Sequence, residues 1–259
     1  MNDYKLFEKF SLQGKLVLVT GASSGLGRHF AQLLSQAGAQ VALAARRVDL
    51  LSSIVTDIEK SGGTAWPIKL DVTDSVSVKQ CFDQLAKFGG IDVVINNAGV
   101  TVTKSILDQS EKNFDDVLDT NLKGCWLVAS EAARRMKEAN RPGNIINIAS
   151  ILGERVAGGV APYAISKAAV IQATKSMALE LARYSIRVNA LLPGYVVTEL
   201  NHEFLTSEAG DKLRTRIPSR QFCSLEDLSG PILLLASNAS QGMSGSCITV
   251  DRAHLVSSL

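Results

Sequence analysis

The chain has 259 residues, with 27 Lys or Arg against 25 Asp or Glu, and its hydrophobic content is 46%. This composition excludes a disordered protein, and the formal net charge of +2, spread over scattered basic residues, gives no reason to expect a nucleic acid as partner. No apolar run approaches the roughly 18–20 residues that span a bilayer, and the charged N-terminal stretch lacks the apolar core of a signal peptide, so we expect no membrane partner and a cytoplasmic location.

Short apolar runs rich in β-branched residues recur along the chain and predict the strands of a parallel sheet. Near-continuous apolarity over such short lengths is typical of strands that are buried on both faces. The runs cover residues 15–20, 40–45, 66–72, 91–96, 144–150, 186–192 and 246–251.

Segments with helical spacing of their apolar residues separate these runs. Residues 27–38 predict a helix that stops at Gly38, residues 49–61 a second helix, and residues 74–89 a third, with Asp74 as N-cap and Gly89 as stop. This alternation predicts the α/β class, as a single doubly wound, Rossmann-type parallel sheet flanked by helices on both faces. No repeat or linker divides the chain, so we expect one domain over residues 1–259.

The stretch from about residue 195 to residue 223 departs from this alternation. It has few β-branched runs and many polar residues, and it follows the C-terminal end of a predicted strand. Because open α/β sheets bind their ligands at that edge, we interpret residues 195–223 as a substrate lid.

The first predicted strand runs into TGASSGLG at residues 20–27 and then directly into a helix. Glycines in such a loop allow a tight turn and a close approach of the backbone to a pyrophosphate, and the helix N-terminus offers free N–H groups to the anion. The loop therefore predicts a dinucleotide site, although a purely structural turn would use the same glycines. The residues of this predicted site are Gly21, Ser23, Ser24, Gly25, Leu26 and Gly27.

A second candidate site lies around residues 150–167. Ser150 ends a predicted strand, which places its hydroxyl at the carboxyl edge of the sheet. Tyr163 and Lys167 are four residues apart in an alanine-rich helical stretch that starts after Pro162, so their side chains project from one helix face. A phenol has a pKa near 10, and lowering it costs ~1.4 kcal/mol per unit, part of which a neighbouring ammonium can supply. Taken alone, the Tyr-x-x-x-Lys pattern also fits an ordinary surface helix.

Together these motifs resemble the classical short-chain dehydrogenases/reductases over almost the whole chain. Seven motifs occur in the family's order, and their agreement is far more specific than any one of them. They are TGASSGLG at 20–27, Asp71-Val72, Asn96-Asn97-Ala98-Gly99, Asn121, Ser150, Tyr163-x-x-x-Lys167, and Pro193-Gly194 with Thr198.

The resemblance implies a role for each motif. Tyr163 is the general acid/base, Ser150 binds the substrate oxygen, and Lys167 binds the nicotinamide ribose and favours the phenolate of Tyr163, while Asn121 holds a water in the proton relay. Asp71 hydrogen-bonds the adenine amino group and Val72 packs nearby, and a capping or turn role of Asp71 before Asp74 is compatible with this contact. The implied contacts of the ribose, carboxamide and pyrophosphate are Asn97, Ala98, Gly99, Pro193, Gly194, Val196 and Thr198, some of which are also plain turn residues.

Residues after the second strand indicate the phosphate state of the cofactor. Ala45 stands where the family's NAD-preferring members usually have Asp, and Arg46 and Arg47 follow it. A guanidinium can bind a 2′-phosphate in bidentate fashion, so we expect NADP(H) to be preferred, with NAD(H) as the alternative. The two arginines could equally solvate a loop.

The resemblance implies an oxidoreductase that moves a hydride between the nicotinamide and a ketone or secondary alcohol, as a homotetramer or homodimer. A 3-oxoacyl-thioester reductase is the first substrate hypothesis, with five basic residues as candidate contacts for carrier or coenzyme phosphates. The alternatives are a polyol, sugar or steroid-type alcohol dehydrogenase using NAD(H), and a non-catalytic dinucleotide sensor. The histidines and cysteines have no metal-ligand spacing, so no metal is expected. The basic residues are Arg141, Lys212, Arg214, Arg216 and Arg220, and the candidate pocket walls are Ile151, Gly153, Glu154, Arg155, Val156, Tyr195 and the stretch 199–216.

The chain departs from the family pattern in one place. Val250-Asp251 is followed by Arg252-Ala253, where the family commonly has two glycines. The change removes backbone freedom at a turn, and we expect altered subunit packing near the C terminus.

Overall fold

A computed structural model describes residues 7–199 and 201–257. Its seven strands form one all-parallel sheet in the order β3-β2-β1-β4-β5-β6-β7. The order reverses between β1 and β4, as in a doubly wound Rossmann-type sheet, which confirms the predicted fold class. The strands are β1 (Leu16–Thr20), β2 (Gln40–Ala45), β3 (Thr64–Lys69), β4 (Val93–Asn96), β5 (Gly143–Ile148), β6 (Ile186–Pro193) and β7 (Cys247–Val250).

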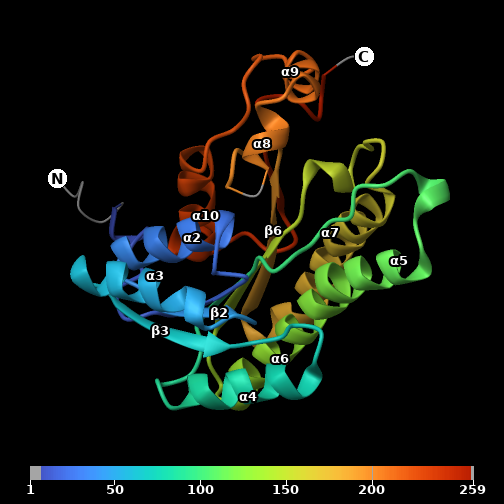
Figure 1. Cartoon of the computed structure of the whole chain (residues 1–259). Coiled ribbons are helices and arrows are strands. Elements are labelled where there is room, and N and C mark those ends of the chain that lie inside the picture. The colour runs from blue at the N-terminus through green and yellow to red at the C-terminus, as the bar shows by residue number, and fades with distance from the viewer. Residues whose placement is uncertain (1–6, 200, 258–259) are drawn as a thin grey trace.

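Helices cover both faces of the sheet (Figure 1). The helices α2 (Gly25–Gln36), α3 (Asp49–Lys60) and α10 (Ser229–Ala236) pack on one face. The helices α4 (Ser75–Ala86), α6 (Cys125–Glu138) and α7 (Ala161–Leu181) cover the other. Successive residues of β1 serve the two layers in turn, since Val17 and Val19 join one core cluster and Leu16 and Leu18 the other.

Shorter elements connect these layers. The helix α5 (Glu111–Leu118) leads through a π-helical turn, Asp119–Gly124, into α6. Short 3-10 helices lie at Ile106–Asp108, Ile151–Gly153, Ala182–Tyr184, Glu226–Leu228 and Asn238–Ser240. The helices α8 (His202–Leu205) and α9 (Glu208–Arg214) lie beyond the carboxyl edge of the sheet (Figure 1). No helix in the described part of the chain is long and apolar enough to cross a membrane.

The predicted element ends agree with the structure where local chemistry sets them. Asp74 caps α4, its carboxylate accepting a hydrogen bond of 2.9 Å from Val76 N. Gly38 has φ +95° directly after the cap of α2. The prediction is less accurate for β3, which covers Thr64–Lys69 and not residues 66–72, because its only partner β2 ends at Ala45, opposite Lys69. The helix α4 likewise ends at Ala86, and Gly89 belongs to the turn that follows.

Candidate active site

Ser150, Tyr163 and Lys167 lie together at the carboxyl edge of β5. Ser150 is 7% exposed and lies two residues beyond β5, and its hydroxyl is close enough to the phenol of Tyr163 to act on the pKa of that group. Lys167 Nζ donates a 2.7 Å hydrogen bond to Ile148 O on β5 and lies 5.5 Å from the centroid of the Tyr163 ring. The i, i+4 spacing on α7 thus sets an ammonium group against the ring of Tyr163, and the Ser150 hydroxyl lies near the phenol of that residue.

Burial sets the proton affinities of this group. Burial raises the pKa of Tyr163, and the hydrogen bond with Ser150 acts against that rise. Burial also lowers the pKa of Lys167 to about 8. Burial therefore disfavours the charged form of both groups. A positive charge near Tyr163 would stabilise its phenolate and so ease proton transfer between Tyr163 and a bound oxygen.

Asn121 lies in the π-helical turn and is 1% exposed. Its Oδ1 accepts a 2.8 Å hydrogen bond from Val100 N, and its Nδ2 donates to Val100 O and to Ser166 Oγ. Ser166 also donates to Tyr163 O, so this amide connects the loop after β4 to the helix that carries Tyr163. Sequence reasoning did not single out Ser166, although its position three residues after Tyr163 on the same helix was a signal that could have found it.

The glycine loop has the geometry that an anion site needs. Gly21 and Gly25 have φ of +64° and +52°, in the region that favours glycine, and a Cβ on Gly27 would collide with Gly21 O. Ser24 is the N-cap of α2 but makes no side-chain capping bond, and no acidic residue lies in the first turn. The main-chain N–H groups in the first turn of α2 therefore have no side-chain cap, and their position next to the tight turn suits a pyrophosphate.

The loop after β4 is bound to the glycine loop. Asn97 Nδ2 donates to Thr20 O at 3.0 Å and to Gly21 O at 3.2 Å, and Thr20 Oγ1 accepts from the main-chain N–H groups of Asn97 and Ala98. A Cβ on Gly99 would lie 3.3 Å from Asn121 Oδ1 and 3.6 Å from Lys167 Nζ. This loop therefore joins the two candidate sites into one.

Four further predicted cofactor residues follow the strands β2 and β3. Arg46 and Arg47 are exposed directly after β2, and neither forms an ion pair within the described residues. Asp71 Oδ1 accepts from Thr73 N and Thr73 Oγ1, so its turn role is confirmed, and Val72 packs closely on Gly124.

The segment after β6 lies over the glycine loop from the other side. A Cβ on Gly25 would be 3.7 Å from Thr198 Cγ2, and one on Gly194 would be 2.8 Å from Asp251 Cβ. Val196 forms a bridge with Cys223, and Pro193 ends β6. The structure therefore brings the candidate residues of all seven motifs to one edge of the sheet.

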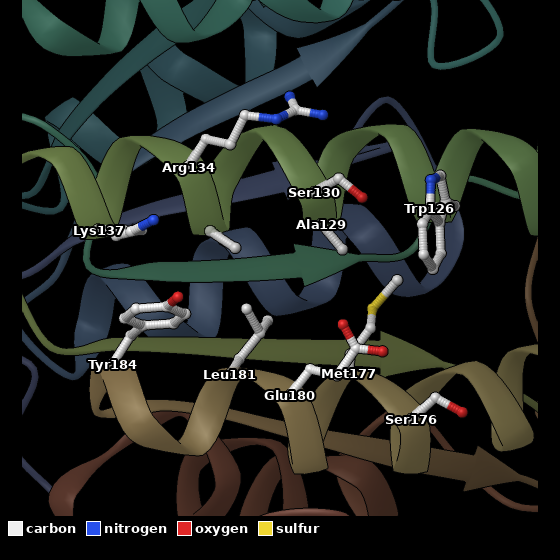
Figure 2. A pocket seen from close by; sticks show the side chains of 11 residues that line it. Trp126, Ala129, Ser130, Arg134, Lys137, Ser176, Met177, Glu180, Leu181 and Tyr184 are labelled. Atoms are coloured by element: carbon white, nitrogen blue, oxygen red, sulfur yellow. The ribbon is translucent and has the colours of Figure 1, made fainter.

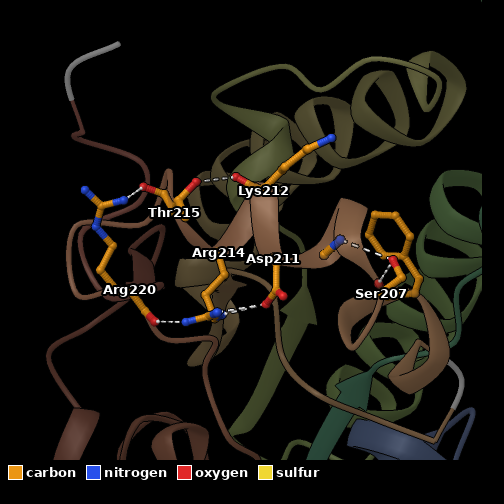
Figure 3. Close-up of polar contacts among 8 residues, drawn as sticks. Ser207, Asp211, Lys212, Arg214, Thr215 and Arg220 are labelled. Carbon is orange, nitrogen blue, oxygen red and sulfur yellow. Dashed lines mark hydrogen bonds and ion pairs between the residues drawn. The ribbon is translucent and has the colours of Figure 1, made fainter.

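Most of the basic residues assigned to phosphate contacts are already paired. Lys212 pairs with Glu208 at 2.7 Å. Arg214 pairs with Asp211 at 2.8 Å and Arg220 donates to Thr215 O, and Figure 3 shows these two contacts. Arg141 pairs with Asp92 at 2.9 Å, at the amino edge of the sheet just before β5. Its assignment, with the lid residues, to carrier or coenzyme phosphates is therefore wrong, because parallel strands place the residues before and after them at opposite edges of the sheet.

The turn after β7 has the left-handed backbone conformation that favours glycine, although its residues are Arg252 and Ala253. Arg252 and Ala253 have φ of +55° and +67°. Arg252 pairs with Asp227 at 2.6 Å and with Gln221 Oε1 at 2.9 Å. These contacts hold the turn in a conformation that costs about 1–2 kcal/mol for a residue with a Cβ.

The chain is similar to proteins of known class. A family model described as enoyl-(acyl carrier protein) reductase matches residues 21–252. A 3-oxoacyl-(acyl-carrier-protein) reductase of Thermotoga maritima is 37% identical over 241 residues, which cover 93% of this chain and 97% of that protein.

Solved structures agree with that match. A crystal structure of a short-chain type dehydrogenase/reductase from Mycobacterium marinum has 40% identity and a TM-score of 0.92, covering 96% of this chain and 98% of that one. A gluconate 5-dehydrogenase from Burkholderia cenocepacia, in complex with NADP and tartrate, has 31% identity and a TM-score of 0.93, covering 97% and 99%. The chain therefore belongs to the short-chain dehydrogenases/reductases and is an NAD(P)-dependent oxidoreductase that acts on CH–OH groups.

Proposed function

We propose that the chain interconverts a ketone and a secondary alcohol with NADP(H) as preferred cofactor and Tyr163 as general acid/base. The observation that carries this proposal is the contact of Tyr163 with Ser150 and Lys167 beside the glycine loop. A non-catalytic dinucleotide sensor would have no need of these three groups in contact.

The cofactor contacts that we propose follow the geometry of the loops. Gly21, Ser23, Ser24, Gly25, Leu26 and Gly27 would hold the pyrophosphate at the start of α2. Arg46 and Arg47 would bind the 2′-phosphate, for which their exposed and unpaired guanidinium groups within the described chain are suited. The adenine and ribose contacts would be Asp71, Val72, Asn97, Ala98 and Gly99, and those of the carboxamide side Pro193, Gly194, Val196 and Thr198.

The proposed chemistry divides between the cofactor and the chain. A bound nicotinamide supplies or accepts the hydride. The Ser150 hydroxyl donates a hydrogen bond to the substrate oxygen, and Tyr163 gives a proton to that oxygen in reduction or takes it in oxidation. Lys167 binds the ribose hydroxyls and its charge favours the phenolate. Asn121 holds a water of the relay through its main chain, because its side-chain amide is already engaged by Val100 and Ser166.

Two substrate classes are supported by relatives. A 3-oxoacyl thioester agrees with the Thermotoga maritima reductase, although the paired lid residues Lys212, Arg214 and Arg220 weaken the case for phosphate contacts. A sugar acid agrees with the Burkholderia cenocepacia dehydrogenase and its bound tartrate.

We further propose that residues 1–259 form one cytoplasmic domain, with residues 195–223 as a lid over the substrate.

We also propose a homodimer or homotetramer. A groove of about 220 Å³ runs between α6 and α7 (Figure 2), and Trp126 beside it is 52% exposed. Arg134 and Lys137 line the α6 side and Glu180 lies on α7. A two-fold axis would set α6 of one subunit against α7 of another, so the opposite charges would meet while the apolar groove is covered.

The test of the proposed reaction is the loss of reduced-nicotinamide absorbance with acetoacetyl-CoA or 5-keto-D-gluconate. NADPH and NADH are compared at equal concentrations. Turnover of at least one ketone, with a higher kcat/KM for NADPH than for NADH, is the expected result. Cofactor binding by a folded protein that reduces neither ketone would favour the sensor hypothesis.

A further inference from the structure

The neighbouring strands β5, β6 and β7 end at the carboxyl edge of the sheet, and a residue with a polar side chain follows each of them. Arg155 comes shortly after β5, Tyr195 directly after β6, and His254 shortly after β7. Because β5, β6 and β7 are neighbours in this order, the three segments converge on the side of Ser150 that lies away from β1 and the glycine loop. This position is next to the reacting group and on the side opposite to the proposed cofactor phosphates.

The side chains of this cluster contact one another. The ring centroids of Tyr195 and His254 are 5.7 Å apart, with an angle of 37° between the rings. Arg155 Nη1 donates to His254 O and, at 3.1 Å, to Ser257 Oγ. The segment that bears Arg155 is also packed on the catalytic helix, since a Cβ on Gly153 would lie 2.8 Å from the main-chain carbon of Lys167. The C-terminal segment is thus fixed beside the helix that carries Tyr163.

Positive charge dominates the surroundings of Tyr195. Burial raises the pKa of Tyr195, and the charges of Arg155 and Arg216 act to lower it. Tyr195 is in turn close enough to Tyr163 to influence the pKa of that phenol. Asp251, whose charge acts on His254, has both carboxylate oxygens engaged by main-chain N–H groups of the turn that follows it.

Two groups near Tyr195, Arg216 and His254, have atoms that lack a protein partner among the described residues. Arg216 forms no ion pair with any residue that the structure describes, unlike Arg214 two positions earlier. His254 is 4% exposed, yet its Nδ1 has no hydrogen-bond partner among the described residues. A guanidinium without a protein partner is available to a carboxylate, and the buried ring of His254 lies against the ring of Tyr195.

We infer that Arg216 and the Tyr195 hydroxyl bind a carboxylate of the substrate, and that Arg155 and His254 position this anion site. The inference rests on the proposed reaction at Tyr163 and deepens it. It assigns the substrate to small hydroxy acids and the corresponding keto acids. The anion must belong to the substrate itself, because the phosphates of a carrier or coenzyme are separated from the thioester by the whole pantetheine arm.

The test compares two ketones that differ only at the predicted anion. L-Sorbose has the carbon chain of 5-keto-D-gluconate with CH2OH in place of the carboxylate. The wild-type protein with NADPH should give a kcat/KM for the keto acid that is about 30-fold or more above that for L-sorbose. Equal values for the two ketones would overturn the inference while leaving the proposed reaction intact. Reduction of acetoacetyl-CoA alone would also overturn it, and no reduction of any ketone would instead contradict the proposed function.

Variants locate the effect. Arg216→Gln and Tyr195→Phe should each raise KM for the keto acid about 10-fold or more, and the kcat/KM for L-sorbose should change much less. Tyr195→Phe keeps the ring that packs on His254, so a folding defect is not expected. Arg214→Gln is the matched control, because Arg214 lies in the same segment and is paired with Asp211. Equal losses for both ketones, or a loss with Arg214→Gln as large as that with Arg216→Gln, would contradict the assignment.

Discussion

Lys167 is a buried lysine whose position depends on the fold around it. Its side chain is 5% exposed, and its Nζ has one protein acceptor, Ile148 O, among the described residues. The other N–H groups of the ammonium are therefore free to bind the ribose hydroxyls in the proposed complex. The four-residue spacing from Tyr163 predicted the shared helix face, but the sequence could not indicate how deeply the ammonium is buried, because that depends on β5 and the loop after β4.

The burial of Lys167 predicts a pH dependence of stability. Because burial lowers the pKa of Lys167 to about 8 from 10.5, the unfolded chain binds a proton that the folded chain has released between these values. The free energy of unfolding due to this group is lowest below pH 8 and rises as the pH passes from 8 to 10.5. Lys167→Met should remove this rise, which amounts to about 3 kcal/mol at most.

Urea unfolding of the cofactor-free protein across this pH window measures the effect. Lys175→Met is the matched control, since Lys175 is an exposed lysine on the same helix. The difference between wild type and Lys167→Met should grow with pH, and the difference for Lys175→Met should not. Parallel pH profiles for the two variants would contradict the assigned burial effect.

At the scale of elements, local chemistry was predictable and tertiary pairing was not. The runs of β-branched residues gave the positions of all seven strands, and Asp74 and Gly38 marked helix ends correctly. The role of Asn97 was not predictable in this way. Its side chain holds the glycine loop through Thr20 O and Gly21 O, which are distant in sequence. The π-helical turn that presents Asn121 also has no simple signature in the residue pattern.

The turn after β7 gives a prediction at this scale. Ala253 is exposed and has φ +67°, so Ala253→Gly should relieve strain and raise the free energy of unfolding by about 0.5–1 kcal/mol. Denaturant unfolding of the two proteins measures the change. Ala139→Gly is the control, because Ala139 is also exposed but has an ordinary φ of −79°, and it should give no gain. A destabilised Ala253→Gly protein would show that the turn is not strained.

At the scale of the whole molecule, the sequence predicted at which edge of the sheet the candidate site lies. It did not predict which charged residues near that edge pair with one another. The lid arginines looked like a basic run, yet Arg214 and Arg220 bond within their own segment and Arg141 lies at the other edge. Such pairing depends on side-chain packing that residue spacing does not determine. The same limit applies to the groove between α6 and α7, whose charges and exposed Trp126 are visible only once the helices are in place.

The proposed subunit contact makes the oligomeric state a test of this groove. Trp126→Glu should place a charge in the covered surface and shift the protein towards monomers in sedimentation velocity. Val76→Glu is the matched control, because Val76 is 60% exposed on α4, away from the groove, and its replacement should leave the assembly unchanged. An unchanged sedimentation coefficient for Trp126→Glu would place the interface elsewhere.

The role of Tyr163 is the central claim, and removing one oxygen atom tests it most directly. Initial rates of NADPH oxidation are compared for the wild type and Tyr163→Phe at saturating cofactor, with the ketone, acetoacetyl-CoA or 5-keto-D-gluconate, that the wild type reduces. The affinity of each protein for NADPH is measured by fluorescence. The account predicts that the rate falls about 10²- to 10⁴-fold, because proton transfer to the substrate oxygen is lost, while the affinity for NADPH changes little. A variant that keeps a substantial part of the wild-type rate would contradict the assignment of Tyr163 as general acid/base.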